Sequence, residues 1–296
     1  KIEVSEFYPT LGGNSANASV TFARHGFKTA CVAIIGKDLA AKEFLAQLKK
    51  DGVKTKLIIQ TDEKPTAQSF LLLKDGERSI LGYHGASDTF KLQDLNLKKL
   101  KARWWYLSLA GESDSMFLPL IEFARQNKIK VAFNPSGHHL KHKRQEILDS
   151  LKDLAFLVLN TGEAAELVGI PFEREKEVFK KLDELTPGIV AVTDGPKGVA
   201  VSDGKNLYKA GIFMEKQVTD RTGAGDSFGS GFVAILAKAK KDYKNPEVIK
   251  EAIRFASANA TSVVEQVGAT EGILTKEQFE SDPRWKNLNG TQSLLG

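Results

Sequence analysis

Short apolar runs that resemble strands alternate with segments of helical periodicity along most of this 296-residue chain. A strand predicted at 130–133, a helix at 141–152 and a strand at 155–159 follow one another in this way. Strands that alternate with helices form a mainly parallel sheet with helices packed on its faces. The sequence therefore predicts an α/β fold in layers.

The same criteria predict the remaining elements. They place helices at 15–24, 40–50, 116–127, 224–240 and 246–267, strands at 29–35, 104–109 and 189–193, and hairpins across Asp75-Gly76 and Asp203-Gly204. His138, His139 and His142 follow a polar Asn-Pro-Ser-Gly run, which predicts a surface loop rather than a metal site. No internal repeat or linker divides the chain, so we expect a single domain over residues 1–296.

The stretch 220–229, Asp-Arg-Thr-Gly-Ala-Gly-Asp-Ser-Phe-Gly, joins a turn of small residues to a predicted helix. The small residues Gly223, Ala224 and Gly225 let backbone N–H groups point into one concave site, and a helix N-terminus favours a bound phosphate. Asp226 would repel that phosphate, so we interpret its carboxylate as the base for a hydroxyl that attacks it. The stretch predicts phosphoryl transfer to an alcohol.

Other interpretations of this stretch are weaker. Residues 225–229 also spell G-x-S-x-G, but no histidine follows Ser227, as the triad order of those hydrolases requires. The glycines lack dinucleotide-binding spacing, and no Walker-type phosphate loop occurs in the chain. A glycine-rich helix start that serves only packing stays open as an alternative.

D-x-T-G-A-G-D at 220–226 resembles the C-terminal signature of the ribokinase-like (PfkB) carbohydrate and nucleoside kinases. Gly-Gly-Asn-Ser-Ala-Asn-Ala at 12–18 is similar to their N-terminal signature, and the similarity continues at 36–38, 160–163 and 193–198. The resemblance covers nearly all of the chain. It implies a three-layer sandwich with a mainly parallel central sheet and a small β-strand lid.

The resemblance also implies that the lid is discontinuous, with contributions from about 1–11 and 66–90. Members of the family begin with a core strand and a substrate-binding Asp well before the Gly-Gly signature. Only eleven residues precede Gly12 here, so we expect that first strand to be missing from this chain. The lid also offers a surface for a homodimer.

Each matched residue acquires a role from the resemblance. Asp226 is implied to take the proton of the acceptor hydroxyl, while backbone N–H groups of Gly223, Ala224 and Gly225 stabilise the transferring phosphoryl group. The residues implied to bind the acceptor are Gly12, Gly13, Asn14 and Asn17. Those implied to bind ATP are Asn160, Thr193, Asp194, Gly195, Gly198 and Asn259. For Asn17, a capping role at a helix start is the alternative.

Two ions are implied as well. Glu163 is implied to orient a hydrated Mg²⁺ that bridges nucleotide phosphates, and its alternative is an ordinary first-turn glutamate favoured by the helix dipole. The backbone around Asp220, Thr222 and Gly268 matches the place where relatives bind a monovalent cation, which adds K⁺. Arg221 stands where many members have a small or neutral residue, and contact with a substrate phosphate or exposure to solvent both stay open.

The implied activity is ATP-dependent phosphorylation of a sugar such as ribose, fructose or a keto-deoxy sugar acid. A nucleoside acceptor is the alternative within the family, and a non-catalytic regulator that binds nucleotide or sugar is the alternative of another class. The net charge of +5 comes from dispersed lysines, so we expect no nucleic-acid partner. A single cysteine, Cys31, and the absence of an apolar run near 20 residues favour a cytoplasmic protein without a membrane partner.

Overall fold

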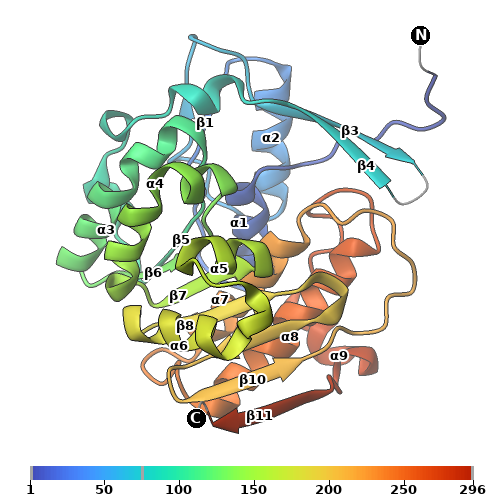
Figure 1. Ribbon diagram of the computed structural model, residues 1–296. Coiled ribbons are helices and arrows are strands. Elements are labelled where there is room, and N and C mark those ends of the chain that lie inside the picture. Colours follow the sequence, from blue (N-terminus) through green and yellow to red (C-terminus); the bar gives the residue numbers. More distant parts are fainter. Residues whose placement is uncertain (1–2, 75–76, 295–296) are drawn as a thin grey trace.

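A central sheet organises the fold in the computed structural model, which describes residues 3–74 and 77–294. Its seven strands lie in the order β11-β10-β9-β8-β7-β6-β5 (Figure 1). They are β5 (Trp104–Leu107), β6 (Lys130–Phe133), β7 (Phe156–Asn160), β8 (Ile189–Thr193), β9 (Val199–Ser202), β10 (Asn206–Ala210) and β11 (Gly290–Leu294). Strands β5 to β8 are parallel, and β9 to β11 each pair antiparallel. The predicted α/β fold with a mainly parallel sheet is confirmed.

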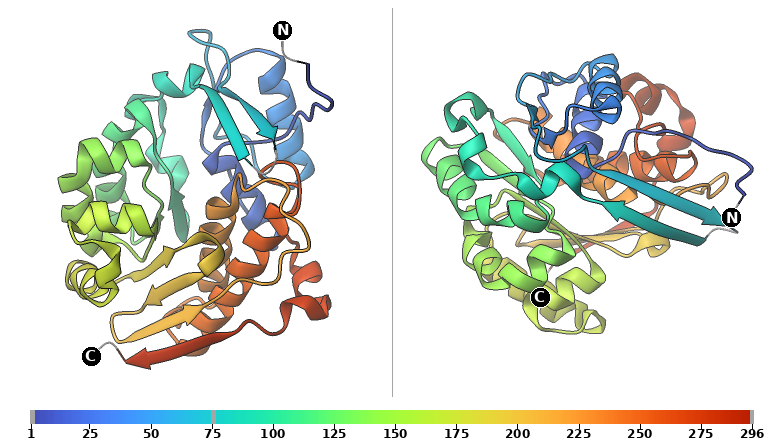
Figure 2. Two further views of the ribbon diagram at one scale, coloured as in Figure 1. Left: turned by 45° about the vertical axis from the view of Figure 1, so that its right-hand side comes forward. Right: turned by 90° about the horizontal axis from the view of Figure 1, so that it is seen from above.

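Helices cover both faces of this sheet, which makes three layers (Figure 2). One face carries α3 (Phe117–Gln126), α4 (Gly137–Ser150), α5 (Thr161–Val168) and α6 (Glu175–Leu185). The other carries α1 (Asn14–Arg24), α7 (Ala224–Lys238) and α8 (Pro246–Val264), with α9 (Lys276–Ser281) beyond them. Successive strand residues serve opposite layers, since Phe156 packs with the α7 side and Leu157 with the other. Parallel strands that are buried on both faces have continuous apolar sequences, as β6, β7 and β8 do.

Helix α7 lies in the interior, and its packing fixes the position of the residues before it. Phe232 stacks on Phe156 of β7 with ring centroids 4.7 Å apart, and all residues from Ser227 to Ala237 are buried. A Cβ atom at Gly229 would lie only 2.4 Å from the hydroxyl oxygen of Tyr106, so glycine lets the helix approach β5. The first turn of α7, with Asp226, is thereby held against the sheet.

Two smaller sheets lie outside the central one. Strand β1 (Ile34–Ile35) pairs parallel with β2 (Ile59–Gln60), and α2 (Leu39–Lys50) follows β1. The strand predicted at 29–35 is therefore shorter than expected, with a single further bridge between Ala30 and Lys54. Strands β3 (Gln68–Lys74) and β4 (Glu77–Tyr83) form the predicted hairpin, which projects from the body of the molecule (Figures 1 and 2). Its predicted Asp75-Gly76 turn is outside the described residues.

Three features differ from the sequence predictions. Residues 3–11 run as an irregular segment and add no strand to the hairpin. Helix α4 begins at Gly137 because Ser136 caps it, accepting a hydrogen bond from the His139 N–H at 3.1 Å. The predicted histidine surface loop is therefore wrong, and His139 is fully buried between Phe117 and Phe133. Helices α5, α6 and α9 and strands β2 and β11 were not predicted.

The predicted Asp203-Gly204 turn is confirmed, whereas β5 ends at Leu107, two residues before the predicted strand end. The Asp203-Gly204 turn connects β9 to β10, and the Asp203 carboxylate accepts hydrogen bonds from the Lys205 and Asn206 N–H groups. Among the helices that the structure describes, none is long and apolar enough to span a membrane.

Candidate active site

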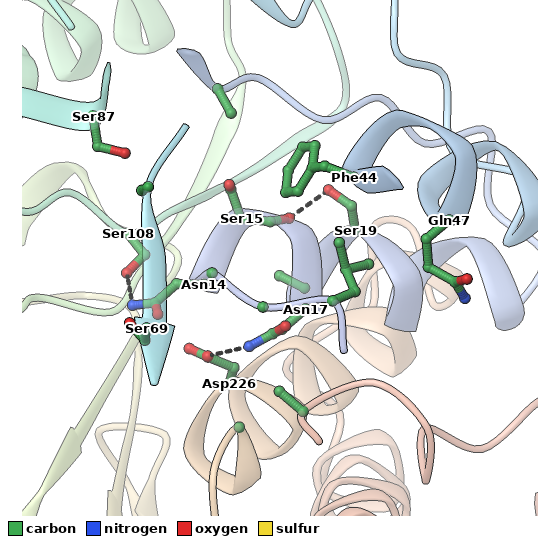
Figure 3. A pocket seen from close by; sticks show the side chains of 18 of the residues that line it. Asn14, Ser15, Asn17, Ser19, Phe44, Gln47, Ser69, Ser87, Ser108 and Asp226 are labelled. Carbon is green, nitrogen blue, oxygen red and sulfur yellow. Dashed lines mark hydrogen bonds between the residues drawn. The ribbon is translucent and has the colours of Figure 1, made fainter. Parts of the chain in front are cut away.

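The two signature segments meet where α1 faces the N-terminal end of α7. Asn17 Nδ2 donates a hydrogen bond to Asp226 Oδ2 at 2.9 Å, across 209 residues of sequence (Figure 3). Asn17 is 3% exposed and lies in the first turns of α1, while Gly13 occupies the N-cap position with a φ of 96°. The capping alternative for Asn17 is therefore wrong. Its amide instead holds the carboxylate that we interpret as the base.

Burial sets the proton affinity of this carboxylate. Removal from water raises the pKa of Asp226 to about 6, and the hydrogen bond from Asn17 partly opposes that rise. A base with a pKa just below neutrality is ionised at pH 7 and still binds a proton readily. This combination suits a group that accepts a proton during one step and releases it afterwards.

The turn before α7 presents backbone donors beside Asp226. Gly223 is the N-cap residue in the left-handed region, with a φ of 80°, and a Cβ there would lie 2.6 Å from the Cβ of Ala269. Only glycine fits this position without strain. The Ala224 N–H is bonded to the Arg221 carbonyl at 3.4 Å. The N–H groups of Gly225 and Asp226 belong to the helix end whose donors lack helical partners and can face an anion.

The four residues expected to bind the acceptor line one cavity together with Asp226. No atom lies within 4 Å of where a Cβ at Gly12 or Gly13 would be, so the backbone is open to a ligand there. Asn14 Nδ2 donates to the Ser108 hydroxyl at 2.8 Å, at the C-terminal end of β5 (Figure 3). The cavity measures about 2350 Å³ because it also extends between β1 and β5.

Three serines of this cavity were missed by the sequence analysis. Ser69 comes from the hairpin strand β3, Ser87 from the turn that follows β4, and Ser108 from the end of β5 (Figure 3). Their hydroxyl groups add hydrogen-bonding capacity to the cavity, and Ser108 is the one bonded to Asn14. For Ser108 alone the sequence offered a signal, since it lies near the C-terminal end of a predicted parallel strand, where ligands usually bind.

Five of the six residues expected to bind ATP lie at the C-terminal ends of β7 and β8, and Asn259 is the exception. Asn160 and Thr193 are register partners at the ends of β7 and β8. Gly195 follows with a φ of 52° and open space at its Cβ position, next to Asp194. None of the six lines the cavity that holds Asp226. Gly198 has a packing reason of its own, since a Cβ there would lie 2.0 Å from the Ala210 carbonyl oxygen.

Asn160 and Glu163 form a reciprocal capping box at the start of α5. Asn160 Oδ1 accepts from the Glu163 N–H and Glu163 Oε2 accepts from the Asn160 N–H, both at 2.8 Å. The box engages one carboxylate oxygen of Glu163. Burial raises the pKa of Glu163, although the hydrogen bond from Asn160 lowers it in part.

Asn259 does not lie where the sequence analysis expected. It is fully buried in α8, where its Nδ2 donates to the Ser227 carbonyl and its Oδ1 accepts from the Leu274 N–H, each at 2.9 Å. Both ends of the amide are thus occupied inside the protein. The expectation that Asn259 approaches adenine is wrong, because its side chain links α8 to α7 and to the chain before α9.

The structure brings Asp220, Thr222 and Gly268 together next to this turn. Asp220 is 4% exposed, and its carboxylate accepts hydrogen bonds from the Thr222 N–H at 2.9 Å and the Gly268 N–H at 3.4 Å. Arg221 is neither buried nor free in solvent, since its Nη1 lies 3.3 Å from Glu215 Oε1. Within the described residues, no cluster of three or more His, Cys, Asp or Glu side chains is arranged to hold a metal.

Comparison with known proteins agrees with this geometry. A model of the pfkB family carbohydrate kinases matches residues 1–276. Ribokinase from Haemophilus influenzae is 30% identical over 283 residues, which cover 90% of this chain and 85% of that protein. A nucleoside kinase from Methanothermobacter thermautotrophicus is 27% identical, covering 88% and 81% of the two chains. The family resemblance read from the signatures is confirmed.

A solved structure shows the same fold. Arabidopsis thaliana ribokinase complexed with ribose and ATP is 25% identical and superposes with a TM-score of 0.77, over 93% of this chain and 88% of that one. The fold of this chain is therefore shared with a ribokinase.

Proposed function

The chain belongs to the pfkB family of carbohydrate kinases, and from this membership we propose that it transfers the γ-phosphate of ATP to a hydroxyl group of a sugar. The observation that carries the proposal is the Asn17–Asp226 contact at the N-terminus of α7. It places a partly buried carboxylate of suitable pKa in one cavity with Gly223, at the helix N-terminus whose backbone N–H groups can face an anion.

The proposed reaction assigns each group one task. Asp226 accepts the proton of the sugar hydroxyl as its oxygen forms a bond to the γ-phosphorus, and the bond from that phosphorus to the bridging oxygen of ADP breaks. The N–H groups of Gly223 and Gly225 stabilise the charge on the transferring phosphoryl oxygens, and the Ala224 N–H joins them if it leaves the Arg221 carbonyl. Asn17 keeps the carboxylate oriented throughout.

We place ATP at the ends of β7 and β8, near Asn160, Thr193, Asp194 and Gly195. Support comes from their position, since open α/β sheets bind ligands beyond the carboxyl ends of parallel strands. Open space at Gly195 suits a phosphate or ribose in close approach to the backbone. Gly198 shapes this loop through its packing against Ala210 rather than through ligand contact.

Two ions fit the residues present. When bound, Mg²⁺ neutralises phosphate charge, and Glu163 suits it through water because the capping box leaves the second carboxylate oxygen available. For K⁺ the candidate place is the backbone around Asp220, Thr222 and Gly268, where the buried Asp220 carboxylate accepts hydrogen bonds from two backbone N–H groups. Carbonyl oxygens there would complete such a site.

The acceptor end favours a polyol. Asn14, Ser108 and Ser69 offer amides and hydroxyls that both donate and accept hydrogen bonds, which suits ribose, fructose or a sugar acid. A nucleoside is the second candidate, because the cavity is longer than a monosaccharide needs and includes Phe44 and Phe90 in its lining. A role without catalysis is disfavoured. A partly buried carboxylate beside a phosphate site costs stability, and a protein that does not catalyse the reaction has no physical need for it.

We also propose that the β3–β4 hairpin is the lid, within one domain, and that two copies pair through it. Phe70, Leu72, Leu81 and Tyr83 are between 43% and 61% exposed on one face of the hairpin. An isolated two-stranded hairpin is marginally stable in water, so an apolar face of this kind is stabilised by a partner surface.

A coupled assay of ADP release tests the proposed function. The chain would be incubated with Mg-ATP, with and without K⁺, and with a panel of sugars, sugar acids and nucleosides. Release of ADP that depends on a sugar supports the proposal, and release only with nucleosides supports the second candidate. Measurable ATP binding without turnover on any acceptor would favour the regulator.

A further inference from the structure

Charge is unevenly distributed at the catalytic end of the cavity. Two fully described segments, 218–226 and 267–271, form this end. Their charged side chains in the cavity lining are three carboxylates, Asp220, Asp226 and Glu271, and one cation, Arg221. A phosphoryl group in transfer carries several negative charges, and backbone N–H groups offset only part of them. Arg221 is therefore the side chain of these segments that can oppose the repulsion.

The present partner of Arg221 is easily exchanged. Its contact with Glu215 spans 3.3 Å, and the side chains are 43% and 18% exposed. Ion pairs with an exposed partner contribute about 0–1 kcal/mol, whereas charge-assisted bonds between arginine and phosphate are stronger and frequently bidentate. An anion that arrives beside Gly223 would thus compete well with Glu215 for the guanidinium.

The residues that follow Glu215 in the sequence are anchored to α8 and to Glu265. Glu265, 7% exposed, accepts a hydrogen bond from the Lys216 N–H and forms an ion pair with Arg284. The Thr219 and Asp220 N–H groups donate to the Val264 carbonyl at the end of α8. Both flanks of the Glu215–Arg221 pair are anchored, so an exchange of partners requires only side-chain rotation.

We propose that Arg221 leaves Glu215 and binds a phosphate group beside the N-terminus of α7, while Glu215 holds the guanidinium ready when no phosphate is bound. The inference rests on the proposed function. Two sources supply this chemistry, the γ-phosphate of ATP or a phosphate already carried by the acceptor, and the experiment below distinguishes them.

Two substitutions are expected to act in opposite directions. Arg221→Gln removes the phosphate contact and should weaken binding by about 10- to 100-fold, the range for a hydrogen bond to a charged group. Glu215→Gln removes the competing partner and should leave binding unchanged or strengthen it by up to about fivefold. Arg221→Lys keeps the charge but loses the planar fork, so its effect should be intermediate. Arg174→Gln is the matched control, because Arg174 also pairs with an exposed glutamate, Glu177, elsewhere on the surface.

Calorimetric titration of the full chain measures nucleotide affinity without turnover, and steady-state kinetics then give the KM for each acceptor. With Mg²⁺ present, β,γ-imido-ATP and ADP are titrated into each variant. Loss of affinity for β,γ-imido-ATP in Arg221→Gln, with ADP binding unchanged, identifies the γ-phosphate as the ligand. Unchanged nucleotide binding together with a raised KM for a phosphorylated sugar, but not for the free sugar, identifies the phosphate of the acceptor.

Other results overturn the inference. It is wrong if Arg221→Gln alters neither the affinity for β,γ-imido-ATP nor the KM for a phosphorylated sugar. It is also wrong if Glu215→Gln weakens binding as much as Arg221→Gln does, since the pair would then be merely structural. A chain that phosphorylates no acceptor but loses β,γ-imido-ATP affinity in Arg221→Gln would refute the proposed function alone. Normal sugar phosphorylation with no effect of Arg221→Gln would refute this inference alone.

Discussion

Removal of the Asn17 side chain should move the pH dependence of catalysis. Asn17 donates to the partly buried Asp226 carboxylate at 2.9 Å and thereby favours its ionised form. A hydrogen bond to a charged group contributes about 1.5–3 kcal/mol, and about 1.4 kcal/mol corresponds to one pH unit. Asn17→Ala should therefore raise the pKa of Asp226 from about 6 by about one to two pH units.

The sign of the effect follows from the role of the base. Only ionised Asp226 accepts the proton, so activity is lost as the pH falls through its pKa. The acid limb of kcat/KM, measured by ADP release between about pH 5 and 9, should lie near pH 6 in the parent chain. It should move to higher pH in Asn17→Ala.

Asn14→Ala provides the matched control for this experiment. Asn14 is an amide of the same helix turn, but it bonds to Ser108 rather than to Asp226. We expect it to raise the KM of the acceptor while the acid limb stays in place. An unshifted acid limb in Asn17→Ala, or an equal shift in both variants, would refute the assignment of Asn17 as the residue that holds the base.

Three further substitutions separate catalysis from stability. Asp226→Asn should lower kcat by about 10²- to 10⁴-fold. Because burial raises the pKa of Asp226, the native state loses stability as the pH rises from about 4 to above 6 and the carboxylate ionises. In urea unfolding, Asp226→Asn should be more stable than the parent by about 2–3 kcal/mol at pH 8 and equal to it at low pH. Asn259→Ala should lower the free energy of unfolding by about 1–3 kcal/mol, because the buried Leu274 N–H loses its acceptor, and the KM for ATP should stay unchanged. A raised KM with normal stability would restore the role of Asn259 at adenine. Gly223→Ala should cost about 1–3 kcal/mol through backbone strain and its clash with Ala269, and a normal melting temperature would contradict this.

Local patterns predicted the fold well where they coincided with burial. The helix that begins after Gly223 and the strands at 130–133 and 189–193 carry continuous apolar or periodic signals that tertiary packing reinforces. The strand expected at 29–35 was overestimated, since its apolar residues pair over only Ile34 and Ile35. Apolar composition favours a strand, but pairing depends on neighbours that are distant in sequence.

The site was predictable in part for the same reason. The signatures assigned Asn17 and Asp226 separate roles toward one acceptor, and the structure shows in addition that Asn17 bonds to Asp226 itself. Asn259 shows the limit, because an amide that satisfies buried backbone groups and one that binds a nucleotide look alike in sequence. His139 likewise gave a polar signal although it packs between aromatic rings.

Phosphorus NMR of the reaction products tests the central claim most directly. The chain and its Asp226→Asn variant would each be incubated with Mg-ATP and the sugar that gives the fastest ADP release. We expect a new phosphate monoester of the sugar, formed in equal amount with ADP by the parent and nearly absent with the variant. Inorganic phosphate in place of a sugar ester, or equal ester formation by both proteins, would contradict it.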